Sequence, residues 1–223
     1  MSNEVPVIAV DGPSASGKGT VAEHVAHALG FRYLDSGAIY RVAALSARMA
    51  DISLDDESRL VALVANLDLH FAIGQIFLNG DNVTHSVRSE EMGNDASRIA
   101  VLPRLRTALL QRQRDFRQPP GLVADGRDMG SVVFPDAMLK IYLTASVEAR
   151  ADRRYKQLKQ KGMYANLAAI LEDLRLRDAR DSGRSAAPLK ICNDAIVLDT
   201  THLTVDDAVK FVVERYHSIV HTT

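Results

Sequence analysis

A glycine-rich segment near the start of the sequence has the residue types that hold phosphate groups. It consists of Gly12, Pro13, Ser14, Ala15, Ser16, Gly17, Lys18, Gly19 and Thr20. Backbone N–H groups in such a loop can all point inward, and a helix that follows presents the positive end of its dipole. Lys18 adds a positive charge, and the Thr20 hydroxyl could assist a magnesium ion directly or through water. These residues at this spacing predict a site for nucleotide phosphates.

The elements on either side of this loop support the interpretation. An apolar run at 7–10 predicts a buried strand before it, and an amphipathic run at 21–29 predicts a helix after it. The loop departs from the common G-x-x-x-x-G-K-[ST] pattern because a glycine follows Lys18 and the hydroxyl comes one residue later. A glycine- and serine-rich turn before a helix is the alternative, which Lys18 and the flanking elements disfavour.

A second polar segment, 35–41, reads Asp-Ser-Gly-Ala-Ile-Tyr-Arg. It follows a predicted short strand at 31–34 and begins a helix predicted to reach Ala50. Ser36 is well placed to cap this helix. The same helix start could offer Ser36, Tyr40 and Arg41 to an anionic ligand, because hydroxyl and guanidinium groups both donate hydrogen bonds to phosphate.

A third polar segment, 125–130, reads Asp-Gly-Arg-Asp-Met-Gly and follows a predicted apolar strand at 122–124. In doubly wound α/β sheets, ligands bind beyond the carboxyl ends of the strands. This segment therefore lies where a second phosphate-bearing substrate is expected. A self-contained, salt-bridged turn is the alternative interpretation.

The stretch between the second and third segments changes from a helical period to a strand period. We expect a helix at 54–66, followed by a small antiparallel sheet inserted between core elements. Its predicted strands are 67–73, 75–78 and 83–87, with a tight turn at 79–80. Residues 93–118 then predict one continuous helix, which the sequence Pro-Pro-Gly at 119–121 ends.

The remainder of the sequence predicts a return to the core. We expect strands at 139–143 and 195–199 and helices at 166–180 and 204–217. The charge-dense segment 148–162 fits either a solvated helix face or a mobile basic flap that closes over nucleotide phosphates and excludes water. Arg177, Asp181 and Arg184 share one face if their helix continues, either as ligand contacts or as an internal salt-bridge cluster.

Composition restricts the classes of protein to consider. The 223 residues include 47% apolar residues, a formal net charge of −1 and one cysteine, Cys192. This balance predicts one soluble α/β unit and disfavours disorder, nucleic acid as a partner, an internal disulfide and a cysteine-based zinc site. The sequence shows no secretion signal and no apolar run of membrane-spanning length, so we expect a cytoplasmic protein without a membrane partner. Nothing in the sequence demands more than a monomer.

Several classes of protein bind phosphates through such a loop, namely GTP-driven switches, ATPase motors, phosphoryl transferases and nucleotide-binding modules without chemistry. The sequence has no D-x-x-G motif and no [NT]-K-x-D motif, which disfavours a GTP switch. Arginine-bearing loops downstream of the phosphate loop are expected when a second substrate must lie in line with the γ-phosphate. These features favour a phosphoryl transferase.

Segments 12–20, 35–41 and 124–130 together resemble the motifs of the bacterial cytidylate kinase family, whose members phosphorylate CMP and dCMP to CDP and dCDP with ATP in pyrimidine metabolism. The resemblance spans nearly the whole chain. It implies a P-loop three-layer α/β fold with a central parallel sheet, an inserted monophosphate-binding subdomain containing a small antiparallel sheet, and a short basic lid. The implied segments are 1–35 (core with the phosphate loop), 36–118 (CMP-binding subdomain), 119–150 (core), 151–164 (lid) and 165–223 (core).

The resemblance also implies roles for single residues of this sequence. It implies that the loop 12–20 and Arg154 hold ATP, with Arg150 as a further flap arginine, and that Mg²⁺ is the cofactor near Thr20. Lys18, Arg127 and Arg184 would promote the transfer. The implied CMP contacts are Ser36, Tyr40, Arg41, Ser97, Arg106, Arg127, Asp128, Arg177, Asp181 and Arg184. Of these, Ser97, Arg106 and Asp128 would read the cytosine edge, and Arg177 and Asp181 would reach the sugar.

The implied mechanism relies on charge. A phosphate oxygen of CMP is already anionic near neutral pH, so no general base is needed and cations supply the catalysis. A kinase for another nucleoside monophosphate such as UMP and a nucleotide-binding regulator without chemistry are the alternatives. Lys18 and the intact arginine loops disfavour the regulator.

Overall fold

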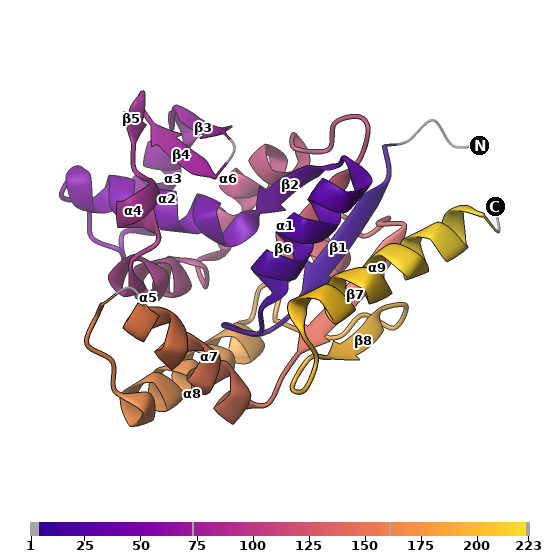
Figure 1. The fold of residues 1–223 in the computed structure, drawn as a ribbon. Helices are drawn as coiled ribbons and strands as arrows, with labels where there is room; N and C mark the ends of the chain where they lie inside the picture. Colours follow the sequence, from indigo (N-terminus) through magenta and orange to yellow (C-terminus); the bar gives the residue numbers. More distant parts are fainter. Residues whose placement is uncertain (1–4, 73, 161, 222–223) are drawn as a thin grey trace. The chain divides into compact units, whose positions relative to one another are not determined.

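A computed structural model describes residues 5–72, 74–160 and 162–221 of the chain. The chain divides into two compact units (Figure 1). The core unit comprises the described residues up to Leu34 and those from Arg114 onward, and the insert unit comprises Asp35–Gln113. Each unit is built around a sheet of its own.

The sheet of the core unit has five strands. They are β1 (Val7–Asp11), β2 (Arg32–Asp35), β6 (Leu122–Gly126), β7 (Leu139–Thr144) and β8 (Ile196–Asp199), and their order is β2-β6-β1-β7-β8. β1 pairs in parallel with β6 and β7, and β7 pairs in parallel with β8. Every residue of β1 and β6 is buried, which explains why both strands read as short apolar runs. The predicted central parallel sheet is confirmed.

Two helices cover one face of this sheet. α1 (Lys18–Leu29) and α9 (Val205–Val220) contact each other, and Figure 1 shows them side by side along the strands. Their apolar sides pack on the strands in one cluster that includes Ile8, Val25 and Val212. Burial of each such side chain stabilises the fold by roughly 1.5–3 kcal/mol. The predicted threonine cap of the last helix is present, since Thr204 and Asp207 form a capping box.

A second pair of helices in the core unit carries most of the basic residues after the third polar segment. α7 (Val147–Gln160) contains the charge-dense segment, and α8 (Leu167–Gly183) packs against it. Asn166 caps α8 by accepting a hydrogen bond from the N–H of Ala169 at 3.1 Å. Because α8 continues to Gly183, Arg177 and Asp181 lie on one helix face, as the sequence predicts.

The insert unit combines helices with a small antiparallel sheet. Its helices are α2 (Ser36–Met49), α3 (Glu57–Ala65), α4 (Thr84–Val87), α5 (Glu90–Ile99) and α6 (Pro103–Arg114), the last of which ends at the first returning residue of the core unit. Its strands are β3 (Leu69–Ala72), β4 (Gln75–Leu78) and β5 (Asp81–Asn82), in the order β3-β4-β5. The predicted small antiparallel sheet between core elements is therefore confirmed, with its third strand at Asp81–Asn82.

The predicted strand at 83–87 is wrong, because these residues form the short helix α4. The ladder ends at Val83, whose N–H donates to the carbonyl of Ile76 at 2.9 Å. Thr84 Oγ1 then accepts from the N–H of Ile76 at 2.8 Å, while the Thr84 N–H donates to Asn82 Oδ1 at 3.1 Å. Side chains thus satisfy the backbone groups that a longer strand would have paired.

The predicted single helix at 93–118 is also wrong, because it divides into α5 and α6 around Pro103. Proline lacks an N–H and disfavours helical geometry in the preceding residue, but it suits the first position of a new helix. Glu57 Oε1 accepts from the N–H groups of Arg104 at 2.7 Å and Leu105 at 3.4 Å, which satisfies the start of α6.

The predicted cap at Ser36 is one residue out of place. Asp35 is the N-cap of α2 and accepts from the N–H of Ala38 at 2.9 Å. Ser36 is the first helical residue, and its hydroxyl donates a hydrogen bond to Gln113 Oε1 of α6. Ile73 in the predicted strand 67–73 and Lys161 in the predicted lid lie outside the described residues. In the described part of the chain, no helix combines the length and the apolar character that crossing a membrane requires.

Candidate active site

The phosphate loop begins directly after β1, at a position where only glycine fits. A Cβ atom on Gly12 would lie 2.0 Å from the backbone oxygen of Leu143 in β7. Any side chain at this position would therefore push the loop away from β7. Gly12 sets the path by which the chain leaves the sheet.

The backbone of the loop alternates in handedness. Ala15 and Gly17 have positive φ angles of 58° and 90°, whereas Ser14 and Ser16 do not. Alternation of this kind turns successive N–H groups toward one side and forms an anion-binding concavity. α1 then begins at Lys18 with Gly17 as its N-cap, so no capping side chain competes with a phosphate for the first N–H groups of the helix.

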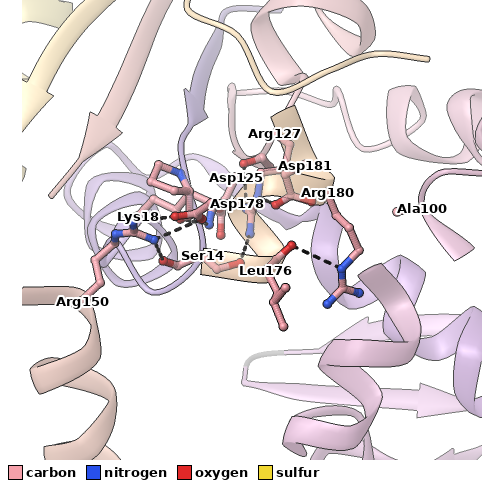
Figure 2. Close-up of polar contacts among 12 residues, drawn as sticks. Ser14, Lys18, Ala100, Asp125, Arg127, Arg150, Leu176, Asp178, Arg180 and Asp181 are labelled. Atoms are coloured by element: carbon pink, nitrogen blue, oxygen red, sulfur yellow. Dashed lines mark hydrogen bonds and ion pairs between the residues drawn. The ribbon is translucent and has the colours of Figure 1, made fainter. Parts of the chain in front are cut away.

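Lys18 lies beside the carboxylate of Asp125. Its Nζ is 3.8 Å from Asp125 Oδ1 and donates a hydrogen bond of 3.3 Å to the carbonyl of Pro13 (Figure 2). Asp125 comes from the carboxyl end of β6, where the parallel register places it opposite Val10. A Cβ on Gly19 would lie 3.0 Å from Asp125 Oδ2. The glycine that interrupts the common loop pattern therefore leaves room for this carboxylate.

Arg127 connects the segment after β6 with the phosphate loop. Its Nη2 donates to Ser14 Oγ at 2.8 Å, and its Nε donates to Asp181 Oδ2 at 2.7 Å. Burial alone would lower the pKa of this guanidinium, but the Asp181 carboxylate, together with Asp125 and Asp11, raises it. Burial likewise disfavours the Asp181 carboxylate, yet Arg127, with Arg184 and Lys18, lowers its pKa. Both side chains are therefore charged near neutral pH.

Asp11, the last residue of β1, holds the backbone of the third polar segment. Its Oδ1 accepts from the N–H of Met129 and its Oδ2 from the N–H of Gly130, each at 2.8 Å. Burial raises the pKa of Asp11 to about 6, although the two N–H donors act in the opposite direction. These bonds fix the start of the π-helical turn Met129–Val133, whose N-cap is the buried Asp128.

Further charged residues of the predicted site lie on and after α8. Arg177 is buried, and its Nε lies 2.9 Å from Asp173 Oδ2. Burial lowers the pKa of Arg177. Arg184, the C-cap of α8, is also buried, and its charge contributes to the lowered pKa of Asp181. α8 thus directs a mixed group of charges toward Arg127, in which Arg177 pairs with Asp173 and Asp181 pairs with Arg127.

The two flap arginines have different environments on α7. Arg150 is buried and pairs with Asp178 of α8, with Nη2 2.6 Å from Asp178 Oδ2. Arg154 is partly exposed and donates to Gln157 on its own helix. Most of the donors of Arg150 are therefore committed within the protein, whereas the assignment of Arg154 to ATP stays a prediction.

The insert unit carries the remaining predicted CMP contacts. Ser36 Oγ donates to Gln113 Oε1 at 2.7 Å. Arg41 Nη1 donates to the carbonyls of Val87 at 3.0 Å and Ser89 at 2.9 Å. The backbone between α4 and α5 thus fixes the direction of the Arg41 guanidinium.

Tyr40 and Arg106 contact each other within the insert unit. The guanidinium carbon of Arg106 lies 5.7 Å from the centre of the Tyr40 ring, and Arg106 Nη1 donates to the carbonyl of Ala100 at 3.1 Å. The hydroxyl of Ser97 is buried and has no hydrogen-bond partner among residues 5–72, 74–160 and 162–221. A buried hydroxyl in that state is costly, and a ligand atom would relieve the cost.

Comparison with known proteins identifies the family. The cytidylate kinase family profile matches residues 8–218. A cytidylate kinase of Chromobacterium violaceum is 58% identical over 212 residues, which cover 95% of this chain and 96% of that one. Those of Paraburkholderia phymatum and Polynucleobacter asymbioticus are 57% identical over 218 residues and 55% identical over 216 residues, covering 98% and 97% of this chain and 96% and 98% of theirs. The chain belongs to the cytidylate kinase family.

As a cytidylate kinase family member, the chain brings some of its predicted site residues together. Ser14, Arg127 and Asp181 form one hydrogen-bonded group in the core unit, and Lys18 lies close enough to contribute to the lowered pKa of Asp181 (Figure 2). Tyr40 and Arg106 form a pair in the insert unit. Ser36 and Arg41 bond to other partners, and Thr20 lies exposed in the first turn of α1.

Two residues of this cytidylate kinase site were not predicted to act in it. Asp11 positions the third polar segment, and Asp125 lies beside Lys18. A signal was present, because both carboxylates directly follow predicted strands. Their roles depend on the pairing of β1 with β6, which brings the ends of strands far apart in the sequence together.

Oxygen donors suited to magnesium occur near the phosphate loop of this cytidylate kinase family member. No group of three or more His, Cys, Asp or Glu side chains that could hold a metal ion is found within the described ranges. Mg²⁺ does not require such a group, because it keeps several waters and binds through one or two carboxylates together with phosphates. Asp125 is such a carboxylate, and Thr20 offers a hydroxyl.

Proposed function

We propose that this protein transfers the γ-phosphate of ATP to CMP and dCMP, yielding CDP or dCDP and ADP, in pyrimidine nucleotide metabolism. The observation that carries the proposal is the 2.8 Å hydrogen bond from Arg127 Nη2 to Ser14 Oγ. It joins an arginine suited to an acceptor phosphate to the loop suited to the donor phosphates. Membership of the cytidylate kinase family supports the identity of the acceptor.

The reaction is an in-line displacement. An anionic oxygen of the CMP phosphate attacks the γ-phosphorus, and the bond to the β,γ-bridging oxygen breaks, so ADP leaves. The nucleophile carries its negative charge near neutral pH, because the second pKa of a phosphate monoester is about 6. A general base is therefore unnecessary, and alignment with charge stabilisation supplies the rate.

The catalytic cations of the proposal are Lys18, Arg127 and Arg184. Lys18 would neutralise donor phosphate oxygens at the start of α1, and Arg127 would bridge donor and acceptor phosphates. Arg184 lies close enough to lower the pKa of Asp181, which supports a place beside Arg127. In a site that excludes water, each well-placed cation can contribute about 3 kcal/mol to the transition state.

Mg²⁺ is the cofactor of this proposal. When bound with ATP, it neutralises charge on the phosphates and polarises the transferring group. Asp125 and Thr20 would hold it, in part through water. The donor set fits, because a carboxylate beside Lys18 and a hydroxyl in the first turn of α1 are hard oxygen ligands.

CMP recognition would use the residues that the family's motifs imply. Ser36, Tyr40 and Arg41 would line the phosphate side, and Arg177 and Asp181 would reach the sugar. Asp128 would accept from the exocyclic amine of cytosine, and Arg106 and Ser97 would donate to its ring acceptors. The buried hydroxyl of Ser97, which lacks a hydrogen-bond partner in the described part of the chain, supports a role toward a ligand.

A monomeric enzyme of the cytoplasm completes the proposal. Light scattering at micromolar concentration tests the monomeric state.

The experiment for the proposal is ADP production with ATP and Mg²⁺ against CMP, dCMP, UMP, AMP, GMP and no acceptor. We expect strong activity with CMP and dCMP alone. Preference for UMP or another monophosphate would contradict the assignment of Ser97, Arg106 and Asp128. Equal ADP production without an acceptor would contradict a transferase altogether.

A further inference from the structure

Two arginines of α7 contact the backbone carbonyl groups of the phosphate loop. Arg150 contacts the carbonyl of Ser14, and Arg153 contacts the carbonyl of Ser16. We propose that Arg150, Arg153 and Asp178, here called the loop clamp, are positioning residues that hold the phosphate loop in its anion-binding conformation. This inference rests on the proposed function of that loop as the ATP phosphate site.

The hydrogen bonds of Arg150 show why it acts on the loop and not on the nucleotide. Its Nη1 donates to the Ser14 carbonyl at 3.0 Å and to Asp178 Oδ1 at 3.1 Å. Its Nη2 donates to Asp178 Oδ2 at 2.6 Å, and its Nε to the carbonyl of Ala145 at 3.1 Å. Four of the five donors of a guanidinium are thereby committed. The side chain is also 6% exposed, so its direction is fixed by protein groups (Figure 2).

Arg153 extends the same contact by one helical turn. Its Nη1 donates to the carbonyl of Ser16 at 3.2 Å and to Thr200 Oγ1 at 3.2 Å, and its Nη2 donates to the carbonyl of Thr200. Thr200 Oγ1 itself lies 3.3 Å from the Ser16 carbonyl. Residues three apart share a helix face, so Arg150 and Arg153 present one surface of α7 to the loop.

The backbone of the loop explains what the loop clamp does. The two bonded carbonyls belong to Ser14 and Ser16, which alternate with the positive-φ residues Ala15 and Gly17. In a backbone of this alternating kind, the N–H groups converge on the concave, anion-binding side of the loop. Carbonyls that are hydrogen-bonded to the arginines on the outer side cannot turn into that concave side. Ala15 has φ of 58°, a conformation that a residue with a Cβ disfavours. The loop clamp therefore maintains a backbone conformation that the loop residues by themselves would not keep.

Arginine is required at these positions because of its geometry. The planar fork of Arg150 reaches two carboxylate oxygens and a carbonyl at once, which the point charge of lysine cannot do. Asp178 sets the direction of the fork and balances its charge. Asp178 and Asp181 lie three residues apart on α8, so one helix face orients both Arg150 and Arg127 on Ser14.

The test compares ATP binding by the wild-type protein with that by the variants Arg150→Gln, Arg153→Gln and Asp178→Asn. The matched control is Arg175→Gln, because Arg175 pairs with Glu148 between the same two helices, at 3.9 Å and with both side chains more than half exposed. Isothermal titration calorimetry with ATP and Mg²⁺ in the absence of CMP measures the affinity of the phosphate loop for ATP directly. We expect the dissociation constant to rise about tenfold in each clamp variant and to change less than about twofold in the control.

Steady-state kinetics and one added substitution distinguish a role in positioning the loop from a general weakening of substrate binding. KM for ATP should rise while KM for CMP stays within about twofold. Ala15→Gly in the Arg150→Gln protein removes the disfavoured Cβ and should restore part of the lost ATP affinity. Unchanged ATP affinity in folded clamp variants would overturn the proposal, as would an absence of rescue. Should Arg150→Gln fail to fold, Asp178→Asn with Ala15→Gly decides in the same way.

The two proposals fail differently. If the wild-type protein binds ATP but does not phosphorylate CMP, the proposed function is wrong and the loop clamp is still tested by the titration. If CMP is phosphorylated and the clamp variants bind ATP normally, only the loop clamp is wrong.

Discussion

Removing the charge of Asp181 tests how Arg127 is held for phosphoryl transfer. In Asp181→Asn, Arg127 Nε loses a charged acceptor at 2.7 Å, and the side chains of the pair are 22% and 10% exposed. Removing one partner of a fully buried pair costs about 3–5 kcal/mol. Arg127 keeps its bonds to Ser14 Oγ and the Gly126 carbonyl, so we expect the smaller loss of one charged hydrogen bond, about 2 kcal/mol. That loss corresponds to roughly 30-fold in kcat/KM for CMP.

Initial rates with varied CMP at saturating ATP measure this effect, and varied ATP at saturating CMP provides the comparison. KM for ATP should change less than about threefold, because the donor loop keeps Lys18 and its backbone N–H groups. Glu172→Gln is the matched control, since it removes a carboxylate from the exposed side of the same helix. An Asp181→Asn enzyme with unchanged kcat/KM for CMP would show that Asp181 does not hold Arg127 for the transfer.

Four further predictions follow from the site. Lys18→Met should lower kcat at least about 100-fold while circular dichroism shows an unchanged fold, and a folded variant with normal kcat would contradict the role of Lys18. Asp128→Ala should reduce the preference for CMP over UMP about tenfold or more with little change in KM for ATP, and an unaltered preference in competition assays would argue against base reading. Gly19→Ser restores the common loop pattern yet should lower kcat/KM for ATP about fivefold, because its Cβ would lie 3.0 Å from Asp125 Oδ2; a gain in activity would sink this explanation. For Asp11, burial raises the pKa from 3.8 to about 6 in the folded state. The contribution of the protonated carboxyl to folding stability is therefore complete below pH 3.8 and is lost as the pH rises through 6. Between pH 4 and 7.5 the unfolding free energy of the wild type should therefore fall by up to about 3 kcal/mol more than that of Asp11→Asn, and parallel denaturation profiles would contradict this shift.

The central sheet could be predicted because its strands carry local signals. β1 and β6 are short, continuous apolar runs that end in polar loops, and both are wholly buried. The phosphate loop was predictable for the same reason, since its glycines and Lys18 are consecutive in the sequence. Such features need no knowledge of distant contacts.

The errors in the insert unit arise where one side chain overrides a pattern. Residues 83–87 follow a tight turn and could pair back as a strand, but Thr84 and Asn82 bond the backbone and begin α4 instead. Pro103 marked the division between α5 and α6, and the helical period on both sides concealed it. Ser36 and Asp35 are both good caps, and propensity alone does not distinguish adjacent candidates.

The unpredicted parts of the site depend on register between distant elements. Asp11 reaches Met129 and Gly130, which follow it by more than one hundred residues, only because β1 pairs with β6. The resemblance implies that Arg150 is a flap arginine, and charge density along a helix does not show which guanidinium is buried. Its ion pair with Asp178, 28 residues away, could not be predicted from the charge-dense segment alone.

Phosphoryl transfer to CMP is measured most directly by following the γ-phosphate of ATP. The protein is incubated with γ-labelled ATP, Mg²⁺ and CMP, and the products are separated by ion-exchange chromatography, with Lys18→Met as the control. We expect the label to appear in CDP, with one CDP formed for each ADP and none in the control. Label recovered as inorganic phosphate, or ADP formed without CDP, would contradict it.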